Sequence, residues 1–262
     1  MSTLTANISF MFQECAFLDR IDAAKAAGID RVECHFPYDT PIPVLKERLA
    51  RASVTLTGLN TAPGDVAKGE WGLAGLPGRT TDFRRDFDQA VDYASALGVP
   101  MIHVMAGVVA PETKAAARNA YVENLRAISP IAAKAGITIL LEPLNTRDKP
   151  NYLVSLCEEI TGVIDEVGQP NVKLLFDVYH VQIMQGDIIK RLERLRDYIG
   201  HIQIAAVPSR AEPDEGEVSY KAIFAAIEAI GYKGLIGLEY KPRGVTEQGL
   251  AWIPKILGNR GK

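Results

Sequence analysis

The chain has 262 residues, 47% of them hydrophobic, and a formal net charge of −3. This size and apolar content allow one sizeable hydrophobic core. Acidic and basic residues are interspersed and no long basic run occurs, which argues against a nucleic-acid-binding surface. No segment approaches the roughly 18 consecutive apolar residues of a membrane span, and the N-terminal residues lack the pattern of a signal peptide.

The three cysteines, Cys15, Cys34 and Cys157, are far apart, odd in number and without metal-binding spacing. Cysteines of this kind suit a reducing cytoplasm, which is therefore the expected location. The sequence does not fix the state of assembly, and a homo-oligomer is compatible with it.

Segments with the pattern of buried strands alternate with segments of helical periodicity along the whole chain. The predicted strands are rich in Ile, Val and Leu, as parallel strands covered on both faces should be. They span residues 7–10, 31–35, 55–59, 101–105, 137–142, 172–177, 199–204 and 235–239. The predicted helices span residues 18–27, 44–51, 82–97, 114–134, 156–167, 188–195, 220–230 and 248–256.

Eight alternating units predict an α/β fold in which a closed (β/α)8 barrel forms a single domain over residues 1–262. A doubly wound open sheet would require a glycine-rich phosphate-binding turn after the first strand, and the segment SFMFQEC has none. One connection, residues 60–81 after the third strand, is long. Because loops that follow barrel strands form the catalytic face, this loop is a candidate lid, with a solvated excursion as the alternative.

Four polar side chains end four consecutive apolar runs in the second half of the chain. The runs are ITILLEP, VKLLFDVYH, IGHIQIA and LIGLEY, and the residues are Glu142, Asp177, Gln203 and Glu239. In a barrel the carboxyl ends of the strands meet at one rim, so we expect these side chains to converge. Buried charges are costly unless they are paired, and carboxylate and amide oxygens suit Mg²⁺ or Mn²⁺. The pattern therefore predicts a divalent-cation site.

Each of these four residues also has a purely structural interpretation. Glu142 could cap a loop, and Asp177 could cap a helix. Gln203 could satisfy a backbone group, and Glu239 could pair with Lys241. The repetition of a polar residue at the same position in four successive units favours one shared site over four separate explanations.

The chain resembles the hydroxypyruvate isomerase family, within the xylose-isomerase-like TIM barrels that also include ketose 3-epimerases and a zinc endonuclease. The resemblance extends over most of the length. Its segments, in chain order, are ANISFMFQE, GDVAKGEWGLAGLPGR, LEPLN, FDVYHVQIMQGD, GHIQIA with a following PSR, and GLEYKP. The segment AAVPSRAEPDEGE departs from the relatives, which often carry Asp-Asn before the proline and Gly before the arginine, but Arg210 is kept.

The resemblance implies an intramolecular oxidoreductase of the aldose–ketose type that acts on a small hydroxy-keto acid in carbohydrate and glyoxylate metabolism. It implies that Glu142, Asp177, Gln203 and Glu239 match the metal-binding positions of related sugar isomerases and epimerases. It also implies that Glu142 and Glu239 are the acid/base pair. Gln203 is the residue expected in this branch, whereas the 3-epimerases usually carry histidine.

An isomerase of this type removes a proton next to a carbonyl, stabilises the resulting enediolate and returns a proton to the adjacent carbon. A carboxylate is a weak base for this step unless burial raises its pKa and a cation stabilises the developing oxyanion. Glu142 and Glu239, on opposite sides of a small pocket, would provide for removal and return. The sequence shows neither which of them acts first nor whether metal is required.

Further residues near the expected rim are candidates for contact with the substrate. His180 follows Asp177 by three positions. Arg210 follows the seventh strand and could bind a carboxylate in a fork. Lys68 and Glu70 in the long loop are weaker candidates. A structural or solvated role is the alternative for each.

The other histidines are interpreted from their positions. His103 lies inside the fourth strand among apolar neighbours and is interpreted as a core residue. His201 shares a face with Gln203 but lies deeper, so it is interpreted as structural. His35, at the end of the second strand, remains open. Trp71 is expected to form an apolar wall of the pocket or to pack in the core.

The leading hypothesis is an isomerase that interconverts hydroxypyruvate and tartronate semialdehyde (2-hydroxy-3-oxopropanoate). A 2-oxo-tetronate isomerase uses the same enediol route and is the nearest alternative, followed by a ketose 3-epimerase. A DNA-repair endonuclease of the same barrel family would require more histidines than the four in this chain, and the negative net charge opposes phosphate binding. A non-catalytic ligand sensor would leave the two glutamates unexplained.

Overall fold

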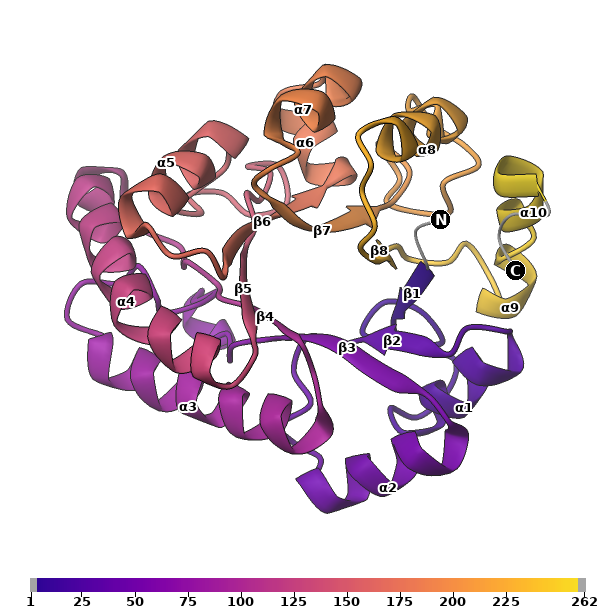
Figure 1. The fold of residues 1–262 in the computed structure, drawn as a ribbon, viewed down its shortest axis with the longest axis horizontal. Helices are drawn as coiled ribbons and strands as arrows, with labels where there is room; N and C mark the ends of the chain where they lie inside the picture. Colours follow the sequence, from indigo (N-terminus) through magenta and orange to yellow (C-terminus); the bar gives the residue numbers. More distant parts are fainter. Residues whose placement is uncertain (1–3, 259–262) are drawn as a thin grey trace.

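The computed structural model describes residues 4–258 and shows a closed barrel of eight parallel strands surrounded by helices (Figure 1). Each strand pairs with the next along the chain, and the eighth closes the ring against the first. The strands are β1 (Leu4–Asn7), β2 (Arg31–Glu33), β3 (Thr55–Asn60), β4 (Met101–His103), β5 (Thr138–Leu141), β6 (Val172–Asp177), β7 (Ile199–Ile204) and β8 (Ile236–Leu238). The predicted (β/α)8 barrel is confirmed.

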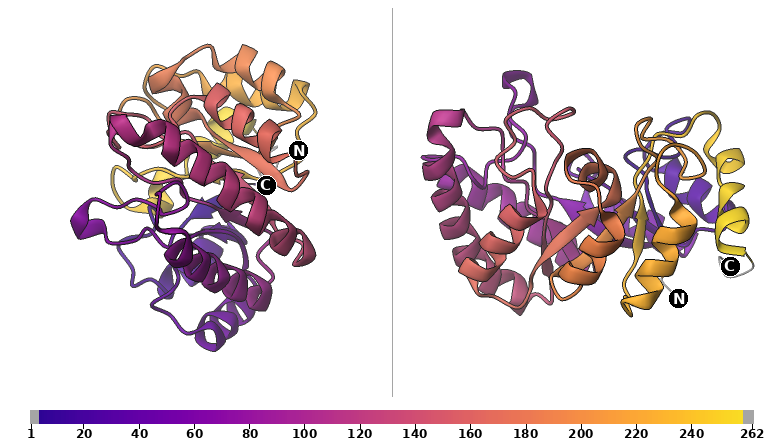
Figure 2. Two further views of the ribbon diagram at one scale, coloured as in Figure 1. Left: turned by 90° about the vertical axis from the view of Figure 1, so that its left-hand side faces the viewer. Right: turned by 90° about the horizontal axis from the view of Figure 1, so that it is seen from above.

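Helices cover the outside of the barrel and connect successive strands (Figures 1 and 2). They are α1 (Asp19–Ala26), α2 (Ile42–Ala52), α3 (Thr80–Leu97), α4 (Lys114–Lys134), α5 (Cys157–Val167), α6 (Val178–Met184), α7 (Ile188–Leu195), α8 (Tyr220–Ala229), α9 (Thr246–Gly249) and α10 (Trp252–Leu257). Two short 3₁₀ helices, η1 (Val66–Lys68) and η2 (Pro111–Thr113), lie in the loops after β3 and β4. Within residues 4–258, no helix is long and apolar enough to cross a membrane.

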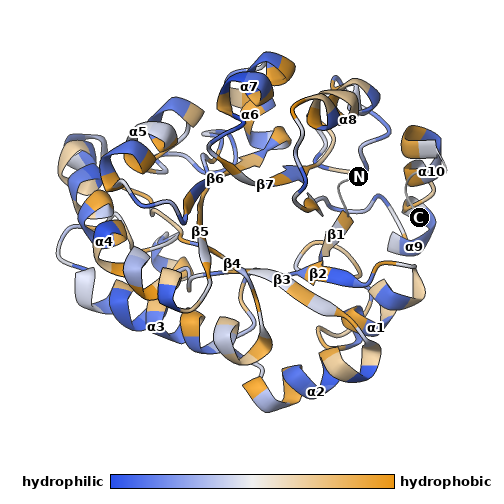
Figure 3. Ribbon diagram, viewed as in Figure 1, coloured by the Kyte–Doolittle hydropathy of each residue, from blue (hydrophilic) through white to orange (hydrophobic). Residues whose placement is uncertain are grey.

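The core lies between the strands and the inner faces of the helices. In Figure 3 the outer helices carry hydrophobic residues beside hydrophilic ones, as amphipathic surface helices do. Phe83 and Phe87 of α3 lie four positions apart, therefore on one face of the helix, and both are buried. Burial of such a side chain contributes about 1.5–3 kcal/mol. This packing holds the helices on the barrel and fixes the strand ends that carry the polar residues.

The first strand and the C-terminal helix differ from their predicted bounds. The strand β1 ends at Asn7, where the prediction had it begin, because the Asn7 carbonyl starts a turn by accepting from the backbone N–H groups of Phe10 and Met11 at 3.0 and 2.9 Å. Ile8 and Met11 are buried in the loop that follows, which explains why this segment resembled a strand. The helix predicted over residues 248–256 is divided into α9 and α10.

A short helix that was not predicted, α6, follows β6 directly. The apolar run changes from strand to helix at Asp177, whose side chain caps α6 by accepting from the backbone N–H of Tyr179 at 2.8 Å. The structural interpretation of Asp177 as a helix cap is therefore correct. Because the chain turns here, His180 in the first turn of α6 stays at the rim of the barrel.

The long loop after β3 packs over the end of β4. The backbone N–H groups of Ala74 and Gly75 donate to the carbonyls of Met105 and Ala106 at 3.4 and 2.7 Å. Gly72 has a φ of +102°, and a Cβ atom there would overlap with Met105, so a glycine allows this close approach. The loop is thus packed on the barrel and is not a free solvated excursion.

Candidate active site

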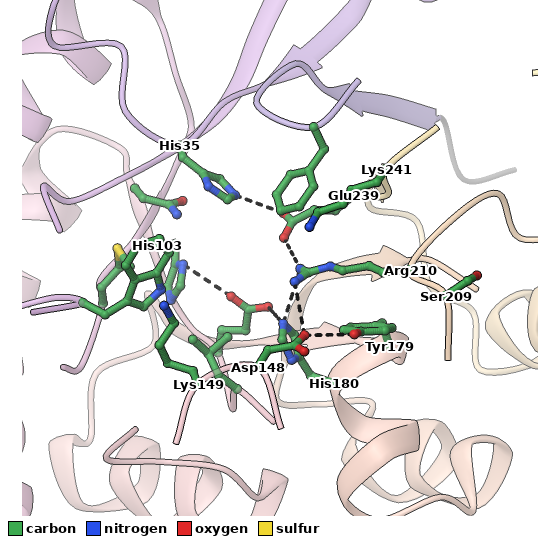
Figure 4. A pocket seen from close by; sticks show the side chains of 16 residues that line it. His35, His103, Asp148, Lys149, Tyr179, His180, Ser209, Arg210, Glu239 and Lys241 are labelled. Atoms are coloured by element: carbon green, nitrogen blue, oxygen red, sulfur yellow. Dashed lines mark hydrogen bonds and ion pairs between the residues drawn. The ribbon is translucent and has the colours of Figure 1, made fainter. Parts of the chain in front are cut away.

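A cavity of about 410 Å³ opens at the carboxyl ends of the strands (Figure 4). It is formed by strand ends and by the loops that follow them, which is where barrel proteins place their active sites. The lining residues are Phe10, His35, Asn60, Trp71, His103, Met105, Glu142, Leu144, Asp148, Lys149, Tyr179, His180, Ser209, Arg210, Glu239 and Lys241.

The structure brings the four predicted metal ligands to this end of the barrel. Glu142 and Glu239 follow β5 and β8 and line the cavity, whereas Asp177 and Gln203 belong to β6 and β7. Asp177 and Gln203 stand side by side in the register of these two strands, and Gln203 pairs with Gly237 of β8. All four side chains are buried, so their charges and dipoles act through a medium of low dielectric constant.

Glu239 is surrounded by partners. Its Oε2 atom accepts from Asn7 Nδ2 at 2.8 Å and from Gln203 Nε2 at 2.7 Å, and it lies 3.4 Å from His35 Nε2. Its Oε1 atom accepts from the Arg210 guanidinium at 2.8 Å. Burial alone would raise the pKa of Glu239, but His35 and Arg210 outweigh it and lower the pKa to about 2. Glu239 is therefore an ionised carboxylate.

Glu142 has few partners. Its Oε1 atom accepts no hydrogen bond from residues 4–258, and its Oε2 atom lies 3.5 Å from His103 Nδ1. Burial, together with the charges of Glu239 and Asp177, raises the pKa of Glu142 well above its usual range. The two glutamates of one cavity therefore have pKa values shifted in opposite directions, the arrangement that separates a proton donor from a proton acceptor.

Three buried oxygen atoms of the predicted ligand set have no hydrogen-bond partner within the part of the chain that the structure describes. They are Glu142 Oε1, Asp177 Oδ2 and Gln203 Oε1. Burial raises the pKa of Asp177 to about 7, although Arg210 opposes the shift. Oxygen atoms left without a donor are costly, and they are the ligands that hard cations such as Mg²⁺ prefer. The residues present thus fit a divalent cation.

His180 could complete a different set, because ligand atoms of Glu142, Asp177 and His180 lie within 4.8 Å of one another. The hydrogen bonds of the imidazole argue against this. Its Nδ1 atom accepts from the backbone N–H of Asn145 at 3.0 Å, and burial and Arg210 lower the pKa of His180 to about 3. The ring is therefore neutral with its proton on Nε2, so it presents a hydrogen-bond donor to the cavity and no lone pair for a metal.

Arg210 lies in the middle of the cavity (Figure 4). Its backbone has a φ of +54°, in the left-handed region. The guanidinium carbon lies 4.8 Å from the Phe10 ring centroid and 4.7 Å from that of Tyr179. The NH2 group lies 2.8 Å from Glu239 Oε1 and 3.7 Å from Asp177 Oδ2. Among the lining residues that the structure describes, Arg210 is thus a strongly buried cation, held between two aromatic rings and beside the carboxylates of Glu239 and Asp177.

Two lining residues that the sequence did not single out are Asp148 and Lys149, in the loop after β5. Asp148 accepts from the Tyr179 hydroxyl at 2.9 Å and lies 3.7 Å from Arg210 NH1. The Lys149 ammonium lies 3.6 Å from the Trp71 ring centroid. Trp71, which was predicted to form a wall of the pocket, therefore also makes a cation–π contact. The tripeptide RDK after LEPLNT was the available signal, but its charges look like those of any surface loop.

Lys68 and Glu70 are not among the residues that line the cavity. Lys68 is 79% exposed and pairs with Asp65 at 2.8 Å. Glu70 accepts from the backbone N–H of Asp65 at 2.7 Å and pairs with Arg79. The structure therefore assigns both residues to the internal bonding of the long loop, and it does not bring them to the other candidate residues.

The interpretation of His103 as a core residue is wrong. His103 lines the cavity, its Nδ1 atom faces Glu142, and its buried Nε2 atom has no partner in the described chain. His35, which the sequence left open, also lines the cavity and faces Glu239. His201 does lie deeper, where its Nε2 atom is 2.9 Å from Glu33 Oε2.

A closed α/β barrel with buried carboxylates around a cavity at its carboxyl end places the chain in the general class of barrel enzymes, and the comparisons with known proteins narrow that class. The model of the family described as xylose isomerase-like TIM barrel matches residues 21–256. The chain belongs to this family.

Individual relatives cover almost the whole chain. The 2-oxo-tetronate isomerase of Cupriavidus necator is 46% identical over 98% of this chain and 100% of the relative. The hydroxypyruvate isomerase of Escherichia coli K12 is 39% identical over 97% of this chain and 98% of the relative. A crystal structure from Brucella melitensis, described as AP endonuclease, family 2, has a TM-score of 0.95 and 42% identity and covers 97% of this chain and 99% of that one.

Proposed function

We propose that the protein is an aldose–ketose-type isomerase that interconverts hydroxypyruvate and tartronate semialdehyde by enediol proton transfer between Glu142 and Glu239. The observation that carries this proposal is the pair of buried glutamates, Glu142 and Glu239, that line one cavity together with the Arg210 guanidinium. The names of the full-length relatives, hydroxypyruvate isomerase and 2-oxo-tetronate isomerase, support the same reaction class.

In this proposal one of the two glutamates accepts a proton from the carbon beside the carbonyl, and the other supplies one to the neighbouring carbon. The return reaction exchanges the two roles. His180 donates its Nε2 proton in a hydrogen bond to a substrate oxygen that gains negative charge in the enediolate. Because the imidazole is neutral, it can stabilise this charge without giving up its proton.

We further propose that Glu142, Asp177, Gln203 and Glu239 hold one Mg²⁺ or Mn²⁺ ion. The three unpartnered buried oxygens support this assignment. When bound, such an ion would stabilise the negative charge of the enediolate oxygens. The neutral amide of Gln203 contributes an oxygen without adding a fourth negative charge to the ligand set.

The substrate carboxylate requires a cation, because the glutamates would otherwise repel it. We assign this contact to Arg210, whose planar guanidinium is held by Phe10 and Tyr179 and can orient a carboxylate. Lys149 is a second cation in the cavity wall, and within residues 4–258 it forms no ion pair with a carboxylate of the protein. Its charge is therefore available to an acidic substrate.

A 2-oxo-tetronate isomerase is the second candidate function. It is favoured by relatives of that name that are 42–46% identical to this chain, above the 39% of the E. coli hydroxypyruvate isomerase. Solved 3-epimerases are only 17–21% identical and share the fold alone. An endonuclease role has less support, because carboxylates at this cavity would repel a phosphate backbone.

The test is solvent exchange followed by NMR in deuterated water, with hydroxypyruvate, a 2-oxo-tetronate and a neutral ketose, each with and without chelator. We expect deuterium incorporation and isomerised product with an acid substrate, and a loss of both on chelation. Exchange into the ketose alone would replace the proposal by a 3-epimerase. We expect this activity in the cytoplasm.

A further inference from the structure

A second polar layer lies beneath the cavity, inside the barrel. Its centre is Glu33 of β2, which is only 4% exposed and does not line the cavity. Glu33 Oε1 accepts from Gln203 Nε2 at 2.8 Å, and Glu33 Oε2 lies 2.9 Å from His201 Nε2. Both partners come from β7, on the other side of the barrel interior. A buried carboxylate that the proposed reaction does not use requires a separate explanation.

The hydrogen bonds of Gln203 supply an explanation for the buried carboxylate of Glu33. Its amide nitrogen donates both protons to carboxylates, one to Glu33 at 2.8 Å and one to Glu239 at 2.7 Å. Because Glu33 and Glu239 each accept one of these bonds, the nitrogen of the amide faces both carboxyl groups. The carbonyl oxygen must then point the other way, and it is the buried Oε1 atom without a partner.

A glycine in β8 leaves space for the contact between Glu33 and Gln203. A Cβ atom at Gly237 of β8 would lie 2.5 Å from Glu33 Oε1, 2.8 Å from Gln203 Cγ and 3.0 Å from His201 Nε2. Any side chain at this position would therefore displace the three residues. The glycine within LIGLEY allows Glu33 to reach across the barrel to Gln203.

We propose that Glu33 is a positioning residue that fixes the amide of Gln203 with its carbonyl oxygen toward the divalent cation. If the amide were turned over, it would present N–H groups to the cation and repel it. Glu33 acts only through Gln203 and does not touch the substrate. The inference rests on the cation site of the proposed function, and it adds the residue that makes an amide usable as a ligand there.

The first experiment is calorimetric titration of the full chain with Mn²⁺. Glu33→Gln should weaken Mn²⁺ binding about 10- to 100-fold, the usual effect of a residue that orients a metal ligand. Glu33→Asp keeps the charge but is too short to reach Gln203, so it should also weaken binding. The matched control is Glu212→Gln, which removes an equally inaccessible carboxylate, 1% exposed and paired with Arg243, and should bind Mn²⁺ as the native protein does.

A double-mutant cycle separates two effects on Mn²⁺ affinity: the orientation of the Gln203 amide and the charge of Glu33. In the Gln203→Glu background the side chain at this position has two equivalent oxygens, so there is no amide to orient. Glu33→Gln should then cause no loss of Mn²⁺ affinity. Equal losses in both backgrounds, or native affinity in Glu33→Asp, would overturn the inference while leaving the cation site intact. A native protein that binds no Mn²⁺ would overturn the cation site and this inference together.

Discussion

The two sides of the cavity rim treat their carboxylates differently. On the β8 side, Glu239 accepts hydrogen bonds from Asn7, Gln203 and Arg210 and also faces His35. On the β5–β6 side, Glu142 Oε1 and Asp177 Oδ2 are buried and accept no hydrogen bond from the described residues. One side thus stabilises a negative charge with hydrogen bonds from the protein, whereas the other leaves two carboxyl oxygens that a proton, a cation or a ligand could satisfy.

This difference would allow the two glutamates to take the different roles proposed for them. On the β8 side, His35 and Arg210 lower the pKa of Glu239, whereas on the β5–β6 side burial and neighbouring carboxylates raise the pKa of Glu142. A proton donor and a proton acceptor must differ in protonation state, and environments that shift two pKa values apart favour this. Substitutions on the β8 side and on the β5–β6 side of the rim should therefore have different effects.

Removal of either glutamate should abolish most proton transfer. Glu142→Gln and Glu239→Gln should each reduce deuterium exchange into the substrate by about 10²–10⁴-fold, the usual contribution of a general acid or base. The measurement is NMR in deuterated water, with circular dichroism to confirm folding. A variant with near-native turnover would show that its glutamate is a ligand or a bystander and not a proton carrier.

The same two substitutions should differ in their effect on stability without metal. Glu239→Gln breaks buried charged hydrogen bonds and leaves Arg210 without its nearest carboxylate, so the free energy of unfolding should fall by about 3–5 kcal/mol. Glu142→Gln removes a carboxyl group whose Oε1 has no partner, so stability should be unchanged or higher. Urea unfolding with chelator measures both. Equal losses would show that the two sides are not energetically different.

Much of the barrel could be predicted from the sequence, because apolar runs and helical periodicity report local structure. The same regularity placed Glu142, Asp177, Gln203 and Glu239 at strand ends. Contacts across the barrel could not be predicted in this way. The hydrogen bond between Asn7 and Glu239 spans 232 positions and exists because β1 closes the ring against β8.

Contacts between side chains across the interior or the mouth of the barrel were not predicted, for a similar reason. The contact of Glu33 with Gln203 spans 170 positions, and periodicity shows only that Glu33 ends a strand. His103 looked like a core residue because its sequence neighbours are apolar, whereas its environment is set by Glu142 on the adjacent strand end. The contact of Lys149 with Trp71 joins two loops whose packing no local pattern specifies.

Cation binding should give Glu142 Oε1 and Asp177 Oδ2 a partner and stabilise the fold. At a Mn²⁺ concentration 100 times the dissociation constant, the free energy of unfolding should rise by about 2.7 kcal/mol. Each kcal/mol shifts the thermal midpoint of a chain of this size by roughly 2–4 °C. Scanning calorimetry with Mn²⁺ or chelator tests this, with Asp177→Asn as the variant that should lose most of the shift. An equal shift in Asp177→Asn would place the ion elsewhere.

Arg210 should affect acidic substrates more than neutral ones. Arg210→Ala should raise KM for hydroxypyruvate by about 10- to 150-fold, the equivalent of about 1.5–3 kcal/mol for a charged hydrogen bond. Arg210→Lys should recover only part of this, because an ammonium cannot form the two-pronged contact. Steady-state kinetics with hydroxypyruvate and a neutral ketose decide the matter. Parallel losses for both substrates would mean that Arg210 shapes the loop and does not recognise the carboxylate.

The smallest expected effect is at the outer edge of the cavity, where Lys149 lies over the Trp71 ring. The ammonium is partly exposed, so its attraction for a substrate carboxylate should be that of a surface ion pair, about 0.2–1 kcal/mol. Lys149→Met keeps the contact with Trp71 but removes the charge, and it should raise KM for an acidic substrate by no more than about fivefold, with kcat unchanged. The effect should shrink as salt concentration rises, because exposed charges are screened.

Lys68→Met is the matched control for this last prediction, because Lys68 is another loop lysine but lies outside the cavity and pairs with Asp65. It should leave KM unchanged at every salt concentration. If both lysine variants raised KM equally, the effect would come from the overall charge of the rim, and the position of Lys149 in the cavity wall would not matter. If Lys149→Met raised KM for a 2-oxo-tetronate more than for hydroxypyruvate, Lys149 would be placed beside the longer end of the substrate, which would favour the four-carbon function.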